Sequence, residues 1–192
     1  PTKKIISNIY GIDIRKKQLE ITKKNLLKKS NKKYDNIINN NIIVNDTIST
    51  NTKTILKKFP EIAENGGFDV IVGNPPYVTI NSTKKIKDDE IFSLLVFGQV
   101  NAATLMIGRA FSLLKEGGKL GLLLPKSILR VKSYKKLRDF LLSKFCIEEL
   151  IDVGIEFNDV RGEQFILIAT KQTQNPKNIQ LGYFLKNKQL ET

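Results

Sequence analysis

Short apolar runs alternate with longer segments of helical periodicity, and this alternation limits the possible folds more than any other feature of the chain. The runs at 42–44, 68–72 and 119–124 have the length and composition of buried strands. The segments 14–29 and 99–115 repeat apolar residues every three to four positions, a spacing typical of helices. Strands that alternate with helices favour a mainly parallel sheet, so the sequence predicts an α/β fold.

The same patterns predict approximate bounds for the remaining elements. We expect further strands at 5–12, 147–153, 164–170 and 181–185. We expect helices at 51–59, closed by Pro60, and at 133–145, with loops at 30–41 and 78–90. The pair Gly117-Gly118 should end the helix of 99–115. No repeat or linker is visible, and 192 residues correspond to one domain, 1–192, at about 150 residues per domain.

Composition excludes several classes of protein. The chain has one Cys and no His, so it can form neither an internal disulfide nor the usual Cys/His zinc site, and histidine cannot act as an acid or base. We therefore expect no metal site. No apolar run approaches the about 18 residues of a membrane span, and no signal peptide is visible, so we expect a cytoplasmic protein without a membrane partner.

The net charge favours a polyanionic partner. Lys and Arg number 32 against 19 Asp and Glu, which gives +13 at pH 7. Such an excess favours nucleic acid, because basic side chains release condensed counterions when they contact phosphates. Lys, Asn and Ile also have AT-rich codons, so part of the excess is open to explanation by genomic bias.

The most specific motif is Asn74-Pro75-Pro76-Tyr77, directly after the apolar run 68–72. In open α/β sheets, ligands bind at the carboxyl ends of strands. Two prolines there remove backbone donors and fix φ, which leaves an acceptor-rich loop. The Asn74 side-chain oxygen, the Pro75 carbonyl and the Tyr77 ring suit a planar substrate with an NH2 group. A proline-rich turn without such a role is the alternative.

This arrangement resembles motif IV of the S-adenosylmethionine-dependent amino-methyltransferases, which methylate the exocyclic amine of adenine in DNA. The segments 110–121, 124–127 and 134–142 resemble one subgroup, the gamma-class N6-adenine methyltransferases, which include fused type IIG restriction-modification enzymes. The resemblance spans about 5–171 with its motifs in unpermuted order. It implies a Rossmann-like methyltransferase sheet, S-adenosylmethionine as cofactor and double-stranded DNA as substrate.

The resemblance also assigns residues to the cofactor. Asp13 and Ile14 match motif II, whose acid accepts hydrogen bonds from the cofactor ribose; a helix N-cap is the other role open to Asp13. Asp46 and Thr47 match motif III, whose acid receives the amino group of the cofactor adenine. Asn45 competes with Asp46 for that role.

Substrate contacts follow in the same way. Phe157 matches the motif VIII aromatic that packs on the extruded base, with a place in the core as the alternative. Two basic clusters could contact DNA phosphates, one with Lys84 and Lys85 and one with Arg130 and Lys132, although a solvated face is the default for such clusters. The cluster of Lys28, Lys29, Lys32 and Lys33 is a weaker candidate.

Two parts of the family pattern are not found in these 192 residues. No Gly-rich turn of motif I precedes Asp13, and no target-recognition domain follows motif VIII. We therefore expect a partial catalytic domain, inactive by itself, that needs N-terminal and target-recognition segments. The family places the motif I strand between the strands of motifs II and IV, so we expect a break in the sheet there. Exposed strand edges would permit self-association.

Two other functions remain open at this stage. A protein glutamine N5-methyltransferase would share Asn-Pro-Pro-Tyr, because a side-chain amide also presents an NH2 group. A non-catalytic DNA-binding or assembly fragment would need the basic surface without the chemistry.

Overall fold

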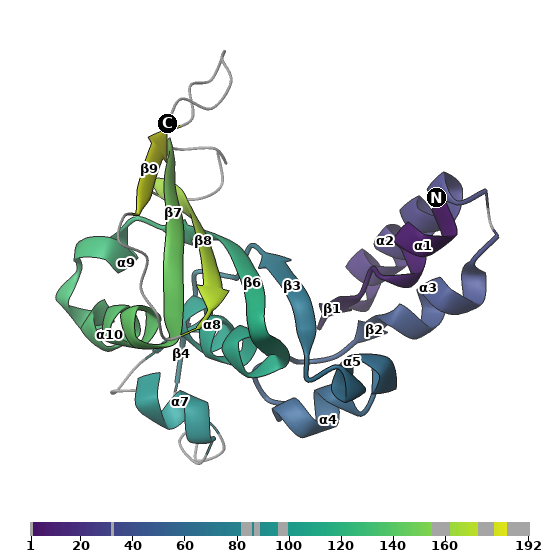
Figure 1. Cartoon of the computed structure of the whole chain (residues 1–192), viewed down its shortest axis with the longest axis horizontal. Helices are drawn as coiled ribbons and strands as arrows, with labels where there is room; N and C mark the ends of the chain where they lie inside the picture. Colours follow the sequence, from purple (N-terminus) through teal and green to yellow (C-terminus); the bar gives the residue numbers. More distant parts are fainter. Residues whose placement is uncertain are drawn as a thin grey trace. The chain divides into compact units, whose positions relative to one another are not determined.

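The computed structural model describes residues 2–31, 33–81, 86, 89–95, 100–154, 162–172 and 179–183. The chain divides into two compact units, 1–59 and 60–192, and each is described by itself (Figure 1). The predicted α/β class is confirmed. The segments that carry Phe157, Lys84 and Lys85 lie outside the described residues.

The first unit is a two-stranded parallel sheet with helices packed on it. Its elements are α1 (Thr2–Ser7), β1 (Gly11–Asp13), α2 (Lys16–Lys29), α3 (Asp35–Asn41), β2 (Ile42–Val44) and α4 (Thr52–Leu56). Strand β1 pairs with β2 in parallel, with Asp13 opposite Val44. A small core of Ile6, Leu19, Ile38 and Ile42 joins α1, α2 and α3 to β2.

Two predictions in this unit are wrong. Residues 2–7 form α1 instead of the start of a strand at 5–12, because a short Ile-rich run does not distinguish the two periods. The predicted loop of 30–41 contains α3, although asparagine is a poor helix former. Burial of Ile38 in the core and a hydrogen bond of 3.0 Å from Asn39 Nδ2 to Asp35 Oδ1 favour the helix.

The second unit contains a five-stranded sheet in the order β3-β6-β8-β7-β9. Its strands are β3 (Phe68–Gly73), β6 (Leu114–Pro125), β7 (Phe145–Gly154), β8 (Gln164–Lys171) and β9 (Gln180–Tyr183), and a separate pair consists of β4 (Thr79–Ile80) and β5 (Val100–Asn101). The helices are α5 (Pro60–Glu64), α7 (Glu90–Leu95), α8 (Ala102–Leu113), α9 (Ser127–Arg130) and α10 (Lys135–Lys144), with a 3₁₀ turn at Lys132–Tyr134.

The strand directions refine the predicted sheet. Strands β3 and β6 are parallel, and so are β7 and β9, whereas β8 is antiparallel to both β6 and β7. The carboxyl ends of β3, β6 and β7 therefore lie at one edge of the sheet, together with the start of β8. The core of this unit packs α8 and α10 against the sheet, with Leu120, Leu124 and Phe145 fully buried.

Several predicted boundaries move. Pro60 opens α5 instead of only closing the preceding helix, because proline suits the first turn of a helix. Helix α8 ends at Leu113, before Gly117-Gly118, and these glycines lie inside β6 where its register against β3 shifts. The predicted loop of 78–90 contains the short strand β4, and Glu90 already begins α7.

The expected break in the sheet is present. Strand β1, which follows the motif II position, and β3, which precedes the motif IV position, belong to different sheets. Among the described strands, β3 pairs only with β6. None of the described helices has the length and hydropathy of a membrane span.

Candidate functional site

The loop Asn74–Tyr77 leaves the carboxyl end of β3 directly beside β6. Gly73 is opposite Leu122, and β6 continues for three residues past that point. The predicted strand is confirmed, but its predicted burial is only partly correct: Phe68 is buried and Ile71 packs on the core, whereas Val70 and Val72 are exposed. Prolines cannot continue the ladder through their own N–H groups, so the chain leaves the sheet here.

The Tyr77 hydroxyl fixes this loop to the sheet. Its Oη lies 2.9 Å from the backbone carbonyl oxygen of Leu123 in β6 and 3.0 Å from Asn74 Oδ1. One hydroxyl hydrogen can be donated to only one of these acceptors at a time. Asn74 Oδ1 has two lone pairs, so it retains the capacity to accept a hydrogen bond from a ligand.

Exposure differs along the loop in a way that suits a binding site. Asn74 is exposed, Pro75 is buried, and Tyr77 is half-buried with its ring against the main core. The carbonyl of Pro75 accepts no hydrogen bond from any described residue. Burial raises the pKa of the Tyr77 hydroxyl, which keeps it protonated as a donor. Downstream, the Ala102 N–H donates to the Val78 carbonyl over 2.8 Å and holds the loop exit.

The first unit presents two acids at the ends of its paired strands. Asp13 ends β1 and Asp46 follows β2, and the Asn45 N–H donates to the Asp13 carbonyl over 3.1 Å. Parallel pairing puts both acids at one edge of this sheet. Asp46 Oδ1 accepts hydrogen bonds from the backbone N–H groups of Ile48 and Ser49.

The Asp13 carboxylate already accepts hydrogen bonds from Arg15. Its Oδ1 accepts from the Arg15 backbone N–H at 2.8 Å, and its Oδ2 accepts from Arg15 Nη2 at 3.2 Å. Partial burial raises the pKa of this carboxyl, but the hydrogen bonds from Arg15 outweigh burial, so the pKa lies below its ordinary value. The charged carboxylate keeps acceptor capacity, which fits a ribose hydroxyl. Helix α2 begins at Lys16 with Arg15 as its N-cap, so Asp13 does not fill the N-cap role.

Ile14 and Thr47, the other two residues that the resemblance assigns to the cofactor, flank these acids. Ile14 follows Asp13 directly and is 63% exposed. Thr47 is half-buried in the turn after Asp46. An exposed apolar side chain beside a carboxylate fits a ligand that has both a flat ring and hydroxyl groups.

Lys126 connects three strand ends of the second unit. The sequence alone did not assign this lysine a role. Lys126 Nζ lies 2.6 Å from Asp152 Oδ2 and 3.3 Å from Glu163 Oε2, and its backbone N–H donates to the Glu163 carbonyl. The hydrogen bond from Lys126 lowers the pKa of the Asp152 carboxyl. The turn Pro125-Lys126-Ser127 was visible in the sequence, but its acidic partners lie 26 and 37 positions downstream.

The predicted phosphate-contacting residues near this turn differ in their availability. Arg130 is exposed, with a 3.9 Å approach of Nη2 to Glu163 Oε2, and Lys132 is exposed as well. Arg138, from the same cluster, donates from Nη1 to the carbonyls of Ile128 and Val131, so it holds the α9 turn instead.

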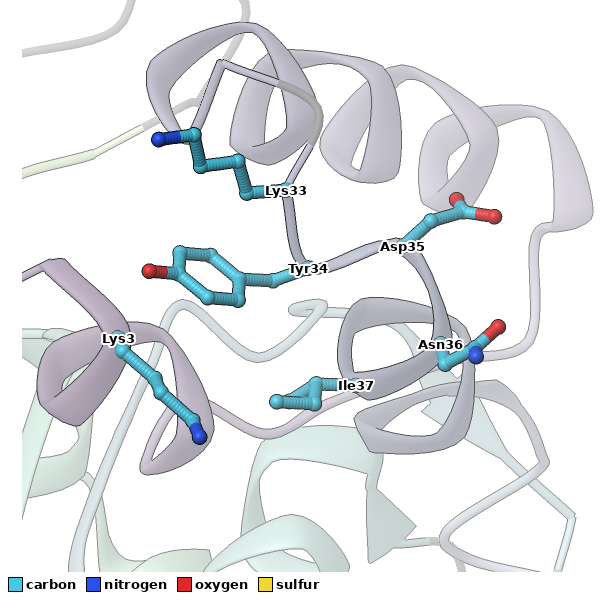
Figure 2. Close-up of a pocket in the computed structure, with 6 residues that line it drawn as sticks. All are labelled: Lys3, Lys33, Tyr34, Asp35, Asn36 and Ile37. Carbon is cyan, nitrogen blue, oxygen red and sulfur yellow. The ribbon is translucent and has the colours of Figure 1, made fainter.

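The first unit also has a hollow of about 430 Å³, lined by Lys3, Lys33, Tyr34, Asp35, Asn36 and Ile37. Figure 2 shows the Tyr34 ring between the side chains of Lys3 and Lys33, with Asp35 and Asn36 directed away. Lys33 belongs to the weaker basic cluster, but the resemblance assigns none of the lining residues to the cofactor or the target base, so the hollow does not correspond to the predicted chemistry.

Comparisons with known proteins identify the family. The chain is 32% identical over 124 residues to the type II restriction enzyme and methyltransferase RM.Eco57I of Escherichia coli. The match covers 62% of this chain but only 12% of that enzyme. A type I restriction enzyme modification subunit from Vibrio vulnificus has a similar fold, with a TM-score of 0.68 and 13% identity over 94% of this chain and 36% of that subunit.

A further structural match is a class I S-adenosylmethionine-dependent methyltransferase from Listeria monocytogenes. It has a TM-score of 0.53 and 22% identity, and the match covers 61% of this chain and 36% of that protein. The Eco57I restriction-modification methylase family matches residues 7–158, which carry the β1 acid, the Asn-Pro-Pro-Tyr loop and the Lys126 turn. The chain therefore belongs to the Eco57I restriction-modification methylase family.

Proposed function

We propose that this chain forms part of a DNA adenine-N6 methyltransferase of a restriction-modification system. The observation that carries the proposal is the Asn74–Tyr77 loop at the carboxyl end of β3, with an exposed amide and a Pro75 carbonyl to which no described residue donates a hydrogen bond. The chain covers 12% of the RM.Eco57I sequence, so activity, substrate and partners are attributed to the complete product of its gene.

The roles follow from the acceptors. Asn74 Oδ1 and the Pro75 carbonyl accept the two hydrogens of an exocyclic amine and leave its nitrogen lone pair directed at the methyl donor. The nitrogen forms a bond to the methyl carbon, the carbon–sulfur bond breaks, and one amine proton is released. Tyr77 contributes the flat face against the base, and its hydroxyl holds Asn74 in place. No covalent intermediate with the protein is needed.

The first unit has groups that fit the cofactor. S-adenosylmethionine supplies an activated methyl group on a sulfonium. Asp13 would accept from its ribose hydroxyls, Asp46 from its adenine amine, and the exposed Ile14 and neighbouring Thr47 would flank the adenine. No glycine-rich turn precedes Asp13 in the 192 residues, so we expect this chain by itself to bind the cofactor poorly and to transfer no methyl group.

DNA is preferred to a protein side chain as the substrate for two reasons. The family match is to restriction-modification methylases, and the chain has a net charge of +13. Extrusion of the base costs a few kcal/mol, which contacts from Tyr77 and Phe157 would offset. A protein glutamine side chain is the alternative substrate, and a non-catalytic DNA-binding role is the alternative for the isolated chain.

The deciding experiment replaces Asn74 by Ala in the complete gene product. Transfer of labelled methyl from S-adenosylmethionine to unmethylated DNA should fall at least about 100-fold, because the amine loses one of its two acceptors in the transition state. Binding of S-adenosylmethionine, measured by calorimetry, should stay within about twofold, since Asp13 and Asp46 are unchanged.

The matched control is Asn36→Ala, which removes an exposed amide in the first unit and should leave methyl transfer unchanged. Near-normal turnover by Asn74→Ala would contradict the proposal. Incubation with a protein lysate instead of DNA distinguishes the glutamine alternative, because label in protein and none in DNA would identify it. Analysis of the labelled nucleoside reports whether adenine is the methylated base.

A further inference from the structure

The positive charge of this chain is concentrated in its first unit. Residues 1–59 contain 14 Lys and Arg against 4 Asp and Glu, a net charge of +10, whereas residues 60–192 contain 18 against 15, a net charge of +3. Codon bias toward AT-rich triplets acts on the whole chain, so it does not explain a difference between its parts. Charge asymmetry of this size is typical of a nucleic-acid-binding segment.

Among the described residues, basic side chains are paired with carboxylates more often in the second unit than in the first. In the second unit, basic side chains meet carboxylates at Lys119–Glu148, Lys126–Asp152, Lys135–Asp139, Lys171–Glu116 and Arg109–Asp89. In the first unit Arg15 pairs with Asp13, but Lys17, Lys24 and Lys28 of α2 are exposed, and their side chains form no ion pair or hydrogen bond with any described residue. Their charges are therefore available to a partner.

These three lysines lie on one face of α2. At 100° per residue, positions 17, 24 and 28 fall within about 40° of one another, on the side opposite the buried Leu19. The stripe of Lys17, Lys24 and Lys28, here called the α2 lysine stripe, also contains the half-exposed Ile21. The exposed Glu20 flanks it, three positions after Lys17 and four before Lys24, and no ion pair joins Glu20 to these lysines among the described residues. It extends about 16 Å along the helix, a length over which duplex DNA carries about ten phosphate charges.

The opposite face of α2 argues against a lipid bilayer as the partner. Leu19 packs in the core of the first unit with Ile6, Ile38 and Ile42, so α2 has no free apolar face to insert into a lipid bilayer. The α2 lysine stripe presents flexible ammonium groups without an apolar pocket. Such a surface suits a regular array of phosphates better than the mixed surface of a folded protein.

We propose that the α2 lysine stripe is a binding surface for the phosphodiester backbone of duplex DNA, separate from the loop that would hold the target base. The contact is independent of sequence and acts through counterion release. The proposal rests on the proposed function only for the choice of DNA as partner, because the stripe would contribute to binding without any methyl transfer.

The test measures binding of the chain to a short fluorescent DNA duplex over a range of salt concentrations, without S-adenosylmethionine. The triple variant Lys17→Gln, Lys24→Gln, Lys28→Gln should reduce the slope of log K against log salt by about 2 to 3, since each lost phosphate contact contributes about 0.9. Glutamine has nearly the helix propensity of lysine, and circular dichroism verifies that α2 remains folded.

The matched control is Lys53→Gln, Lys57→Gln, Lys58→Gln, which removes the same charge from exposed lysines on α4 and the turn after it. Its slope should stay within about 1 of the unmodified chain. The triple change to Arg at 17, 24 and 28 should retain the full slope. An unchanged slope in the Gln variant of the stripe, or equal losses in the stripe and control variants, would overturn the proposal.

This result is distinguishable from failure of the methyltransferase assignment. The salt-dependence assay contains no S-adenosylmethionine and detects no methyl transfer, whereas the Asn74→Ala experiment measures methyl transfer by the complete gene product. A stripe variant with a reduced slope therefore supports the DNA contact even if methyl transfer is never observed.

Discussion

At the scale of single residues, Tyr77 has two functions that its hydroxyl and its ring divide between them. The hydroxyl contacts the Leu123 carbonyl and Asn74 Oδ1, and the ring packs on the core of the second unit. A hydroxyl that fixes the amide of a neighbour reduces the conformations open to Asn74. Orientation of this kind is part of what a methyltransferase needs, because the amine must be held in one geometry.

Tyr77→Phe should therefore lower the free energy of unfolding by about 1 kcal/mol at pH 7, the net contribution of a typical hydrogen bond. Burial raises the pKa of the Tyr77 hydroxyl in the folded state above its ordinary value of 10.0. The neutral hydroxyl thus stabilises the fold fully below about pH 10, and this contribution disappears as pH rises through the folded pKa.

Denaturant titrations at several pH values, with Tyr34→Phe as the control, measure the difference. The Tyr34 hydroxyl has no hydrogen-bond partner among the described residues, so the control should differ little from the unmodified chain. If Tyr77→Phe and the unmodified chain were equally stable at pH 7, the hydroxyl would not fix the loop.

At the scale of elements, Lys126 holds the ends of β6 and β7 and the residue before β8 together. Lys126 leaves only 19% of its side chain exposed, and it meets both Asp152 and Glu163. Lys126→Met keeps most of the packing of the side chain but removes its charge. It should lower the free energy of unfolding by about 0.5 to 1 kcal/mol, because both carboxylates are partly exposed and solvent screens the attraction.

Hydrogen exchange gives the local readout for this variant. The amides of Gly154 and Gln164, which pair across β7 and β8 beside Lys126, should exchange faster than in the unmodified chain. Lys135→Met is the control, since Lys135 forms an exposed pair with Asp139 on α10. Equal exchange in the two variants would show that Lys126 does not hold these strand ends.

The helices and strands also show how much of this structure the sequence predicts. The runs at 42–44 and 68–72 and the periodic helix at 14–29 are predicted nearly to the residue, because one pattern dominates each. Helix α3 was missed because burial of Ile38 outweighs the poor propensity of asparagine. The Tyr77–Leu123 contact joins residues 46 positions apart, so no local pattern contains it. The Asn-Pro-Pro-Tyr motif predicted the position of the loop, whereas its hydrogen bond to β6 depends on the tertiary fold.

At the scale of the whole molecule, each unit has its own apolar core. Among the described residues, Ile6, Leu19, Ile38 and Ile42 form the cluster of the first unit, which also buries Ile55 and Phe59, whereas the cluster of the second unit has 17 buried residues. A small core stabilises less against conformational entropy. The first unit should therefore open at a lower free energy than the second, and a ligand bound by Asp13 and Asp46 would reduce that opening by mass action.

A pair of core variants tests this independence. Ile38 and Leu120 are 1% and 0% exposed, and truncation of such a residue to Ala costs about 2 to 5 kcal/mol. Because the two residues belong to different cores, Ile38→Ala should accelerate hydrogen exchange in α2 and α3 and leave β6 to β8 unchanged. Leu120→Ala should have the reverse effect. Mass spectrometry of peptides from both variants makes the comparison, and a uniform loss of protection throughout the chain in either variant would mean that the two cores unfold as one.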